Sequence, residues 1–272
     1  MEAGLKRLRV TSIRSAHLIR LVLLFAGILS FILAVIVNSQ ILTFIGLGLI
    51  FWGALFFFVT PQRYVDGSLL GSSTLSSYQT ISRIVRDLKV KSRGYYIPPF
   101  PRNEYLPDHL KGLKEMVVFV PEETNVEIPS IEEMAEGKFL LKNPKGILIV
   151  PPGAGILNRI ESQFSVDFNN MDFAALRELL PRFILEKFGL AEELDLSINE
   201  NLVDMEVAGS VYKDLYSNDL NLESVSIFGC PIISAVACVL AKATGKAVTL
   251  NKLQFSPNNQ IKAQFTIISR RS

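Results

Sequence analysis

The chain has 272 residues, 49% of them hydrophobic, and a formal net charge of +2. Residues 1–93 hold 11 Lys and Arg against 3 Asp and Glu, a net of +8, whereas residues 94–272 hold 17 against 23, a net of −6. The positive charge flanks two apolar stretches, where basic residues orient a membrane protein and meet anionic lipid. The acidic remainder argues against nucleic acid as a partner.

Two apolar segments near the N-terminus, at about 18–37 and 41–60, predict a two-helix transmembrane hairpin. Each is long enough to cross about 30 Å of hydrocarbon, and Asn38, Ser39 and Gln40 supply a tight turn between them. A cleaved signal peptide is the alternative. It is disfavoured because a second apolar segment follows at once, without a small-residue cleavage site.

Basic residues at the two ends of the hairpin predict its orientation. Arg14 and Arg20 precede or begin the first helix, Arg63 follows the second, and the turn is uncharged. We therefore expect a cell-membrane protein with two spans and with both termini in the cytoplasm. Residues 21–37 and 41–60 contain no Asp, Glu, Lys or His. Ionisable residues inside the membrane are typical of transporters, so their absence from these two segments argues against a transporter.

Small residues predict how the two helices touch. They recur every four residues in the first helix and every seven in the second, at Ala26, Ser30, Ala34, Gly46 and Gly53. Such residues let helix backbones approach closely in lipid. The alternative is that Gly and Ala are simply common in membrane helices.

A connector is expected over residues 61–107. After a Ser- and Gly-rich start, an apolar stripe from Leu75 predicts an amphipathic helix that Gly94 ends. The stripe either packs on the folded domain or lies on the membrane surface, and we favour packing because the basic residues are few. The proline-rich segment Tyr95–Pro107 is expected to run extended along the domain surface.

Residues 108–272 predict a globular α+β domain of antiparallel strands with interspersed helices. Strands are expected at 115–120, 138–142, 147–150, 194–198, 202–212, 247–255 and 261–268. Helices are expected up to Phe164, at 172–188 with a kink at Pro181, and at 232–244. The last helix is apolar nearly all round, which indicates that it is buried.

A glycine loop is the first candidate site. Gly153 and Gly155 precede a helix, and such loops can hold a phosphate with backbone N–H groups. No Gly-Lys-Ser/Thr follows, and Asn158 stands where a dinucleotide-binding fingerprint has its third glycine. A tight turn explains the glycines equally well.

Cys230 is the one candidate nucleophile, because the N-terminus of a helix lowers the pKa of a thiol. Its apolar neighbours act in the opposite direction, so we favour a small core residue. Neither His17 nor His109 has a His or Cys nearby at metal-ligand spacing. We therefore expect no catalytic residues, no metal site and no cofactor.

The C-terminal part resembles a known family. A strand, Gly229-Cys230-Pro231, a buried helix that ends in Thr244-Gly245-Lys246 and a final hairpin are similar to the C-terminal half of the vinyl-reductase-type small-molecule-binding domain. That domain shares its fold with the TRAPP vesicle-tethering subunits. The resemblance covers residues 194–269.

That domain commonly carries cysteines in the final hairpin. This chain has Ser256-Pro257-Asn258-Asn259 there, which argues against a ligand or metal role for the hairpin. The whole layout also resembles uncharacterised archaeal membrane-anchored proteins, a resemblance that implies no activity.

Three classes of function are compatible with these features. The first expectation is a membrane-anchored cytosolic binding or interaction module, a non-catalytic scaffold or assembly factor. Its partners would be the lipid bilayer and either another protein or a second copy. The alternative is a membrane-tethered small-molecule sensor with an apolar pocket near helix 232–244. A lipid-modifying enzyme is the third class, for which the sequence offers no convergent polar cluster.

Overall fold

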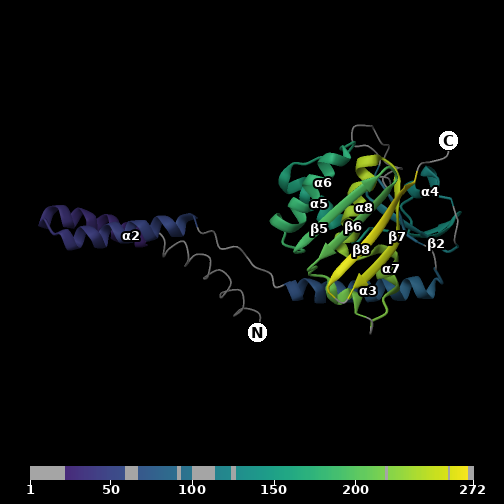
Figure 1. Ribbon diagram of the computed structural model, residues 1–272, viewed down its shortest axis with the longest axis horizontal. Coiled ribbons are helices and arrows are strands. Elements are labelled where there is room, and N and C mark those ends of the chain that lie inside the picture. Colours follow the sequence, from purple (N-terminus) through teal and green to yellow (C-terminus); the bar gives the residue numbers. More distant parts are fainter. Residues whose placement is uncertain are drawn as a thin grey trace. The chain divides into compact units, whose positions relative to one another are not determined.

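The computed structural model of the protein describes residues 22–58, 67–90, 93–99, 114–123, 127–217, 220–256 and 258–268 (Figure 1). The chain divides into two compact units, Met1–Tyr64 and Val65–Ser272. The predicted membrane-flanking residues Arg14, Arg20 and Arg63 lie outside the described residues, as do His17 and His109.

The first unit contains two helices, Val22–Val37 and α2 (Gln40–Phe58). Asn38, at a φ of 55°, reverses the chain between them. The two helices touch where a side chain would not fit. A Cβ on Gly46 would lie 2.9 Å from the backbone nitrogen of Phe31, and one on Gly53 would lie 2.8 Å from the Leu24 side chain.

The contact face of the first helix differs from the expected one. Gly27 and Ala34 are buried, whereas Ala26 is exposed. Gly27 contacts Ile50: a Cβ on Gly27 would lie 2.8 Å from the backbone nitrogen of Ile50. The small residues at the contact therefore repeat every seven residues in both helices. Ala34 and the two glycines of α2 were predicted correctly, and the four-residue repeat was not.

One helical stretch among the described residues is long and apolar enough to cross a membrane, and it is not in the first unit. It runs from Glu223 to Thr244, and 94% of its apolar 18-residue segment is buried. The apolar stretches Val22–Val37 and Gln40–Phe56 are shorter. The segments expected to span, at about 18–37 and 41–60, both extend beyond the described residues. A single buried stretch of this kind is weak evidence of a membrane link.

The second unit is a mixed α+β fold built on one sheet of eight antiparallel strands. The strands occur in the order β3-β4-β2-β1-β7-β8-β6-β5. Their bounds are β1 Tyr95–Ile97, β2 Val117–Pro121, β3 Leu140–Lys142, β4 Lys145–Ile149, β5 Glu193–Asn199, β6 Leu202–Ala208, β7 Ala247–Ser256 and β8 Gln260–Ile268. The predicted strands are confirmed, with ends that shift by a few residues.

Strand β1 corrects the expectation for the proline-rich segment. Its first residues do run extended, but they lie inside the sheet between β2 and β7, and Tyr96 is fully buried. Pro98 and Pro99 follow directly and cannot donate to a sheet ladder, which limits the strand to three residues. Residues 100–107 lie outside the described part of the chain.

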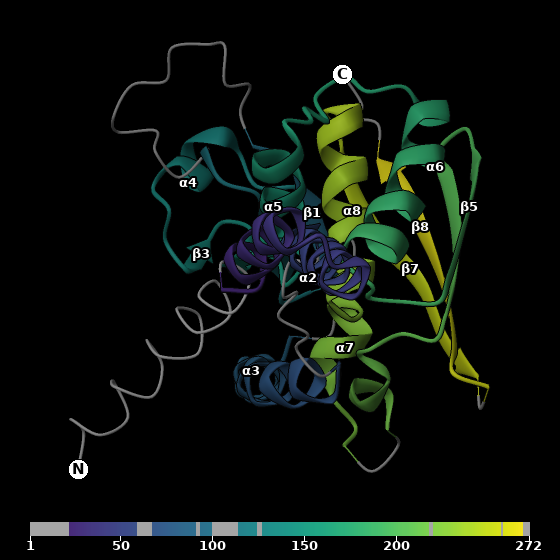
Figure 2. The same cartoon turned by 90° about the vertical axis from the view of Figure 1, so that its left-hand side faces the viewer.

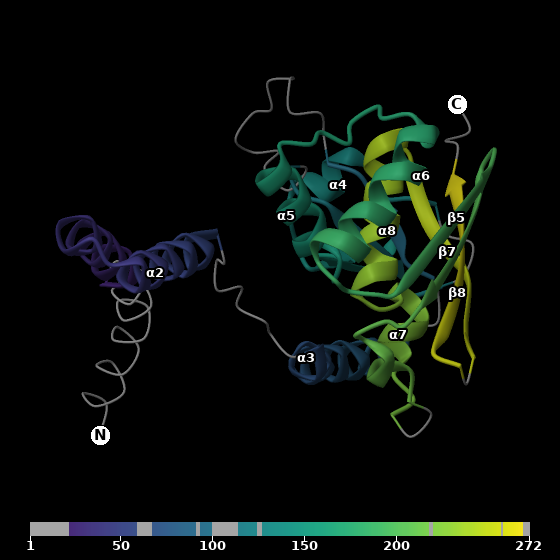
Figure 3. The same cartoon turned by 60° about the vertical axis from the view of Figure 1, so that its left-hand side comes forward.

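The helices of this unit are α3 Gly67–Asp87, α4 Ile131–Ala135, α5 Ala154–Phe164, α6 Phe173–Pro181, a π-helix Arg182–Lys187, a 3₁₀ helix Lys213–Tyr216, α7 Glu223–Phe228 and α8 Pro231–Thr244. Helices α5, α6 and α8 lie on one face of the sheet (Figures 2 and 3). Helix α8 packs on β1, β7 and β8, and nearly all its side chains are buried, as its composition predicts.

Helix α3 starts earlier and ends earlier than expected. It begins at Gly67, because hydroxyls such as those of Thr74 and Thr80 bond to carbonyls one turn back and accommodate the Ser-rich stretch in a helix. It ends at Asp87, before Lys89 at a φ of 53°, rather than at Gly94. Its buried stripe packs on α7, which favours the packing interpretation over a membrane-surface helix.

Pro181 changes the type of its helix. Asp172 is the N-cap, as predicted, and α6 runs to Pro181. The proline has no N–H, and the chain then continues as a π-helix with a bond from Phe188 N–H to the Phe183 carbonyl at 3.0 Å. Gly189, at a φ of 59°, ends the segment as predicted.

A sharp break separates α7 from α8 at Gly229, whose φ is 67°. The break is buried, so its backbone polar groups need partners other than water. The Tyr96 hydroxyl donates to the Phe228 carbonyl at 2.9 Å, and the Tyr78 hydroxyl donates to the Gly229 carbonyl at 2.8 Å. The Cys230 N–H donates to the Tyr216 hydroxyl at 3.0 Å. Three tyrosines from β1, α3 and the 3₁₀ helix thus satisfy one break.

A second buried contact joins α3 to α7. The Ser224 hydroxyl donates to the Tyr78 carbonyl at 2.9 Å and lies 2.8 Å from the Ser82 hydroxyl. The Ser224 N–H also donates to the Ser82 hydroxyl, at 3.1 Å. These bonds and the Tyr78 hydroxyl attach α3 to the core at adjacent turns. Figure 2 shows α3 and α7 next to each other.

Replacing Tyr78 or Tyr96 with Phe should lower the free energy of unfolding by about 1–3 kcal/mol each, because a buried carbonyl loses its donor. Tyr95→Phe is the matched control, since Tyr95 neighbours Tyr96 in β1 but is only half-buried. Its effect should stay within about 0.5 kcal/mol. Urea unfolding of the full chain, followed by near-ultraviolet circular dichroism, measures all three. Equal losses for Tyr95→Phe and Tyr96→Phe would contradict this assignment.

Candidate functional site

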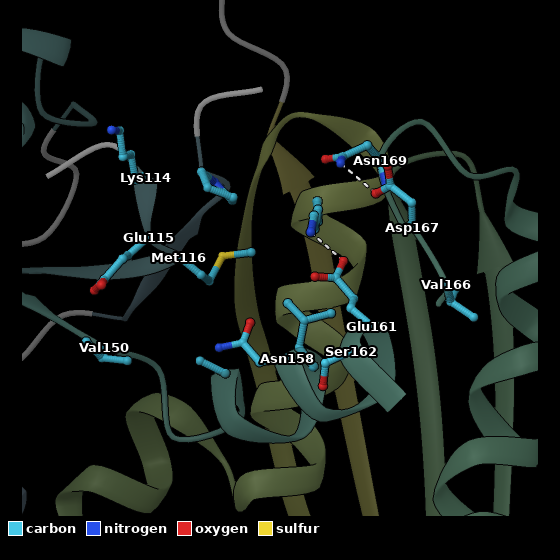
Figure 4. A pocket seen from close by; sticks show the side chains of 14 residues that line it. Lys114, Glu115, Met116, Val150, Asn158, Glu161, Ser162, Val166, Asp167 and Asn169 are labelled. Carbon is cyan, nitrogen blue, oxygen red and sulfur yellow. Dashed lines mark hydrogen bonds and ion pairs between the residues drawn. The ribbon is translucent and has the colours of Figure 1, made fainter. Parts of the chain in front are cut away.

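A cavity of about 700 Å³ beside the C-terminal end of α8 is the best candidate site in the described part of the chain (Figure 4). Its walls come from α5, from the residues that precede β2 and from the loop between α5 and α6. Residues that line it include Met116, Leu157, Asn158, Glu161, Asp167 and Lys242. Its volume lies within the range of ligand-binding pockets.

A buried ion pair forms part of the cavity wall. Lys242 of α8 donates through its Nζ to a carboxylate oxygen of Glu161 on α5, and the two side chains are 5% and 9% exposed. Lys242 is the only charged residue of α8. It lies in the last turn, where the partial negative charge of the helix end also favours a cation.

Amide and carboxylate groups extend the polar part of the wall. The backbone N–H and the side-chain amide of Asn169 donate to Asp167 Oδ1 at 3.0 and 2.6 Å. Figure 4 shows Met116 and Asn158 extending into the space between β2 and α5, whereas the charged ends of Lys114 and Glu115 extend away from it. The cavity beside this helix, near which an apolar pocket was expected, is therefore lined by both apolar and polar groups.

Gly153 lies where the loop before α5 touches α8. A Cβ at this position would overlap the backbone nitrogen of Ala235, so only glycine fits. Its N–H donates to the Ser234 hydroxyl at 3.0 Å. Gly155 is exposed, and a Cβ there would meet no atom within 4 Å. Close packing accounts for Gly153, and anion binding by this loop stays an untested prediction.

Cys230 lies away from the cavity, at the N-cap of α8. Burial raises the pKa of its thiol above the ordinary value, although the Tyr216 hydroxyl and nearby backbone N–H groups act to lower it. Burial also raises the pKa of Tyr216 and Tyr78 beside it. A buried, protonated thiol favours the core interpretation of Cys230 over the nucleophile interpretation.

None of the predicted site residues Gly153, Gly155 and Cys230 lines the cavity. Ala154, between the two glycines, does line it. The ion pair of Lys242 and Glu161 was not predicted. A lone lysine in an otherwise apolar helix was the available signal, because such a charge needs a partner when buried. In the described ranges, no cluster of three or more His, Cys, Asp or Glu side chains could hold a metal ion.

The chain matches a known domain family over residues 2–266, the domain of unknown function DUF7982, and belongs to it. No curated protein and no solved structure matches the chain. The resemblance to the vinyl-reductase-type domain and the TRAPP subunits therefore gains no support from these comparisons.

Gly153→Ala should destabilise the second unit by about 1–3 kcal/mol or more, because the new methyl group overlaps the backbone of α8. Gly155→Ala is the matched control two residues away. It should be neutral or stabilising by up to about 1 kcal/mol, because alanine is the better helix former. Thermal unfolding of the two variants separates them. Equal behaviour would show that the close approach to α8 is absent.

The stability of the fold should fall as the pH rises above about 8.5. Burial raises the pKa of Cys230 and of Cys238, so the unfolded thiols lose protons while the folded ones keep them. Each thiol then removes up to about 1.4 kcal/mol per pH unit. Urea unfolding at pH 7.5, 8.5 and 9.5 measures the slope. The double variant Cys230→Ala, Cys238→Ala should have a shallower slope, and an unchanged slope would contradict the assignment.

Proposed function

We propose that this member of the DUF7982 family is a membrane-anchored cytosolic binding module without catalytic activity, and that it binds a small molecule in the cavity beside α8. The observation that carries the proposal is the ion pair of Lys242 and Glu161 in the cavity wall. Burying a charge at the end of an otherwise apolar helix is costly. In a pocket wall, such a charged pair is a polar group that can orient a bound ligand.

The exposed apolar side chains of the first unit support a membrane anchor. Phe25 and Phe44 are each 76% exposed, and most of the other large apolar residues of both helices are exposed as well, to smaller extents. Each such side chain would gain about 1.5–3 kcal/mol by leaving water. Helix α2 has 19 residues, which at about 1.5 Å each reach roughly 28 Å, close to the thickness of the hydrocarbon layer.

Two spans with both ends in the cytoplasm are the topology that we propose. Arg14 and Arg20 flank the first helix and Arg63 follows the second, whereas the turn at Asn38 and Ser39 is uncharged. The other apolar stretch, Glu223–Thr244, is a poor span because Gly229 interrupts it and protein encloses it. Its apolar surface is already covered.

Small-molecule binding is favoured over catalysis because two pairs of polar residues in the cavity wall bond to each other. Lys242 bonds to Glu161, and Asp167 accepts two bonds from Asn169. The one candidate nucleophile, Cys230, does not line the cavity. A lipid-modifying enzyme would need a nucleophile or base converging there.

A scaffold that binds another protein is the second candidate, and one observation favours it. The sheet ends at the short edge strand β3, where Phe139 and Leu140 are 44% and 55% exposed. An apolar groove of about 360 Å³ lies beside them, lined in part by Leu88 and Ile147. Exposed apolar patches of this kind often contact proteins.

A charge placed in the first unit should weaken membrane insertion. Phe51 in α2 and Leu69 in α3 are both 62% exposed, so they form a matched pair. Phe51→Arg should cost about 2.5–3.5 kcal/mol of insertion free energy and reduce the fraction that resists alkaline carbonate extraction. Leu69→Arg should leave that fraction unchanged. Equal extraction of the two variants would contradict the proposed anchor.

Native mass spectrometry of the full chain, released from lipid nanodiscs, tests ligand binding. We expect a reproducible additional mass of small-molecule size. The double variant Lys242→Met, Glu161→Leu should lose it yet remain as stable as the parent or more so, because a buried pair is often replaceable by apolar side chains. A bare dimer without added mass would favour the scaffold. An added mass that persists in the double variant would place the ligand elsewhere.

A further inference from the structure

Strand β5 forms an open edge of the sheet. It stands last in the strand order, pairs with β6 on one side, and lies at the right-hand margin of the second unit in Figure 2. An antiparallel edge strand leaves the N–H and C=O groups of alternate residues without a strand partner. The other edge strand, β3, has three residues, whereas β5 has seven. The β5 edge therefore offers the longer row of backbone donors and acceptors.

Most of the usual protections of an edge are absent from β5. Natural edge strands are often very short, interrupted by a bulge or a proline, or lined with charged residues, lysine above all. Strand β5 pairs with β6 at seven consecutive positions without a register shift, and it contains no Pro, Lys or Arg. Its charged residues are both acidic, so the edge repels one class of strand and attracts another.

The open face of the β5–β6 pair is acidic throughout. Neither strand contains a lysine or an arginine. The carboxylates on this face are Glu193, Asp195, Asp204 and Glu206. The charge is therefore concentrated at the edge of the sheet, beside the place where another strand would pair.

Asp195 in particular lacks a cation. It lies directly opposite Glu206 in the ladder, where like charges are destabilising. The Lys262 Nζ donates to Glu206 at 2.5 Å, whereas within the described ranges no side-chain hydrogen bond or ion pair reaches Asp195 or Glu193. A basic side chain on a strand added beside β5 would supply the missing cation from the next cross-strand position.

Charge also disfavours a second copy of this chain as the added strand. Two β5 strands paired with each other would place two sets of these carboxylates side by side on one face. The side chains on the other face of β5 are apolar, because Leu194 and Leu196 are buried and Ile198 is half-buried. The segment that fits β5 therefore alternates basic and apolar residues, with its basic side chains on the face of Asp195.

We propose that β5 binds an extended basic segment of another protein, which joins the sheet as an additional strand. Main-chain hydrogen bonds hold the segment, and its lysine or arginine side chains pair with Asp195 and Glu193. No residue of β5 lines the cavity beside α8, so this inference goes beyond the proposed small-molecule binding and stands or fails independently of it.

Two peptides of equal charge separate strand addition from simple charge attraction. The first is acetyl-Lys-Val-Lys-Val-Lys-Val-Lys-amide, and the second carries N-methyl groups on its three central residues. Alternate N–H groups of an added strand point at β5, so the methyl groups remove at least one ladder bond in either register. Fluorescence anisotropy measures the binding of each labelled peptide to the full chain in nanodiscs of neutral lipid, with empty nanodiscs as the blank. We expect the first peptide to bind about tenfold more tightly or better. Equal binding of the two peptides, or binding of neither, would overturn the proposal.

Asp195→Asn and Asp87→Asn are a matched pair of variants for the charge requirement. Both aspartates are exposed, and Asp87 lies at the end of α3. Asp195→Asn should weaken binding of the first peptide about two- to fivefold, the effect of one exposed ion pair, and Asp87→Asn should leave it unchanged. Equal weakening in the two variants would show that only the net charge of the chain attracts the peptide, and would overturn the proposal.

Hydrogen exchange locates the peptide in the parent chain and so depends on no variant. The first peptide should lower the deuterium uptake of residues 193–199, because their outward N–H groups become bonded. Uptake at the other edge strand, residues 140–142, should not change. Protection of residues 140–142 instead, or of neither edge, would contradict strand addition at β5.

Discussion

The enclosure of α8 is the constraint on which the second unit depends. A helix that is apolar on every side must be surrounded by protein, and the polar groups at its ends then need partners without water. At its start, the hydroxyls of Tyr78, Tyr96 and Tyr216 satisfy the break from α7. Those tyrosines come from α3, from the central strand β1 and from the 3₁₀ helix, so the same break holds three distant segments together.

The side of α8 that contacts α5 is enclosed differently, and the candidate site results from that difference. In the first turn of α8, Ser234 bonds to the loop before α5, which Gly153 allows to approach closely, and in the last turn Lys242 bonds to Glu161. Purely apolar residues there would make a closed core. The charged pair instead gives the neighbouring cavity one polar wall. In the first unit, by contrast, the apolar helices are not covered by other protein segments, and their apolar side chains are exposed.

The sequence predicted local elements better than it predicted their neighbours. The final hairpin with Ile261 and Phe265 inward, and α8 with its buried faces, followed from periodicity and from proline and glycine at the helix ends. Strand β1 was missed because three residues before a proline run carry too little pattern, and its place in the sheet is set by long-range pairing. For the site, Gly153 drew attention for phosphate chemistry, whereas its environment is a helix contact. The partner of Lys242 could not be read from sequence, because Glu161 is distant along the chain.

The central claim is that the two kinds of apolar helix have different surroundings, lipid for the first unit and protein for α8. Photolabelling of the full chain in bilayers, with an apolar carbene precursor dissolved in the acyl phase, tests it most directly. The account predicts labels on residues 22–58 and none on the buried stretch Glu223–Thr244. Labels on Glu223–Thr244, or their absence from residues 22–58, would contradict it.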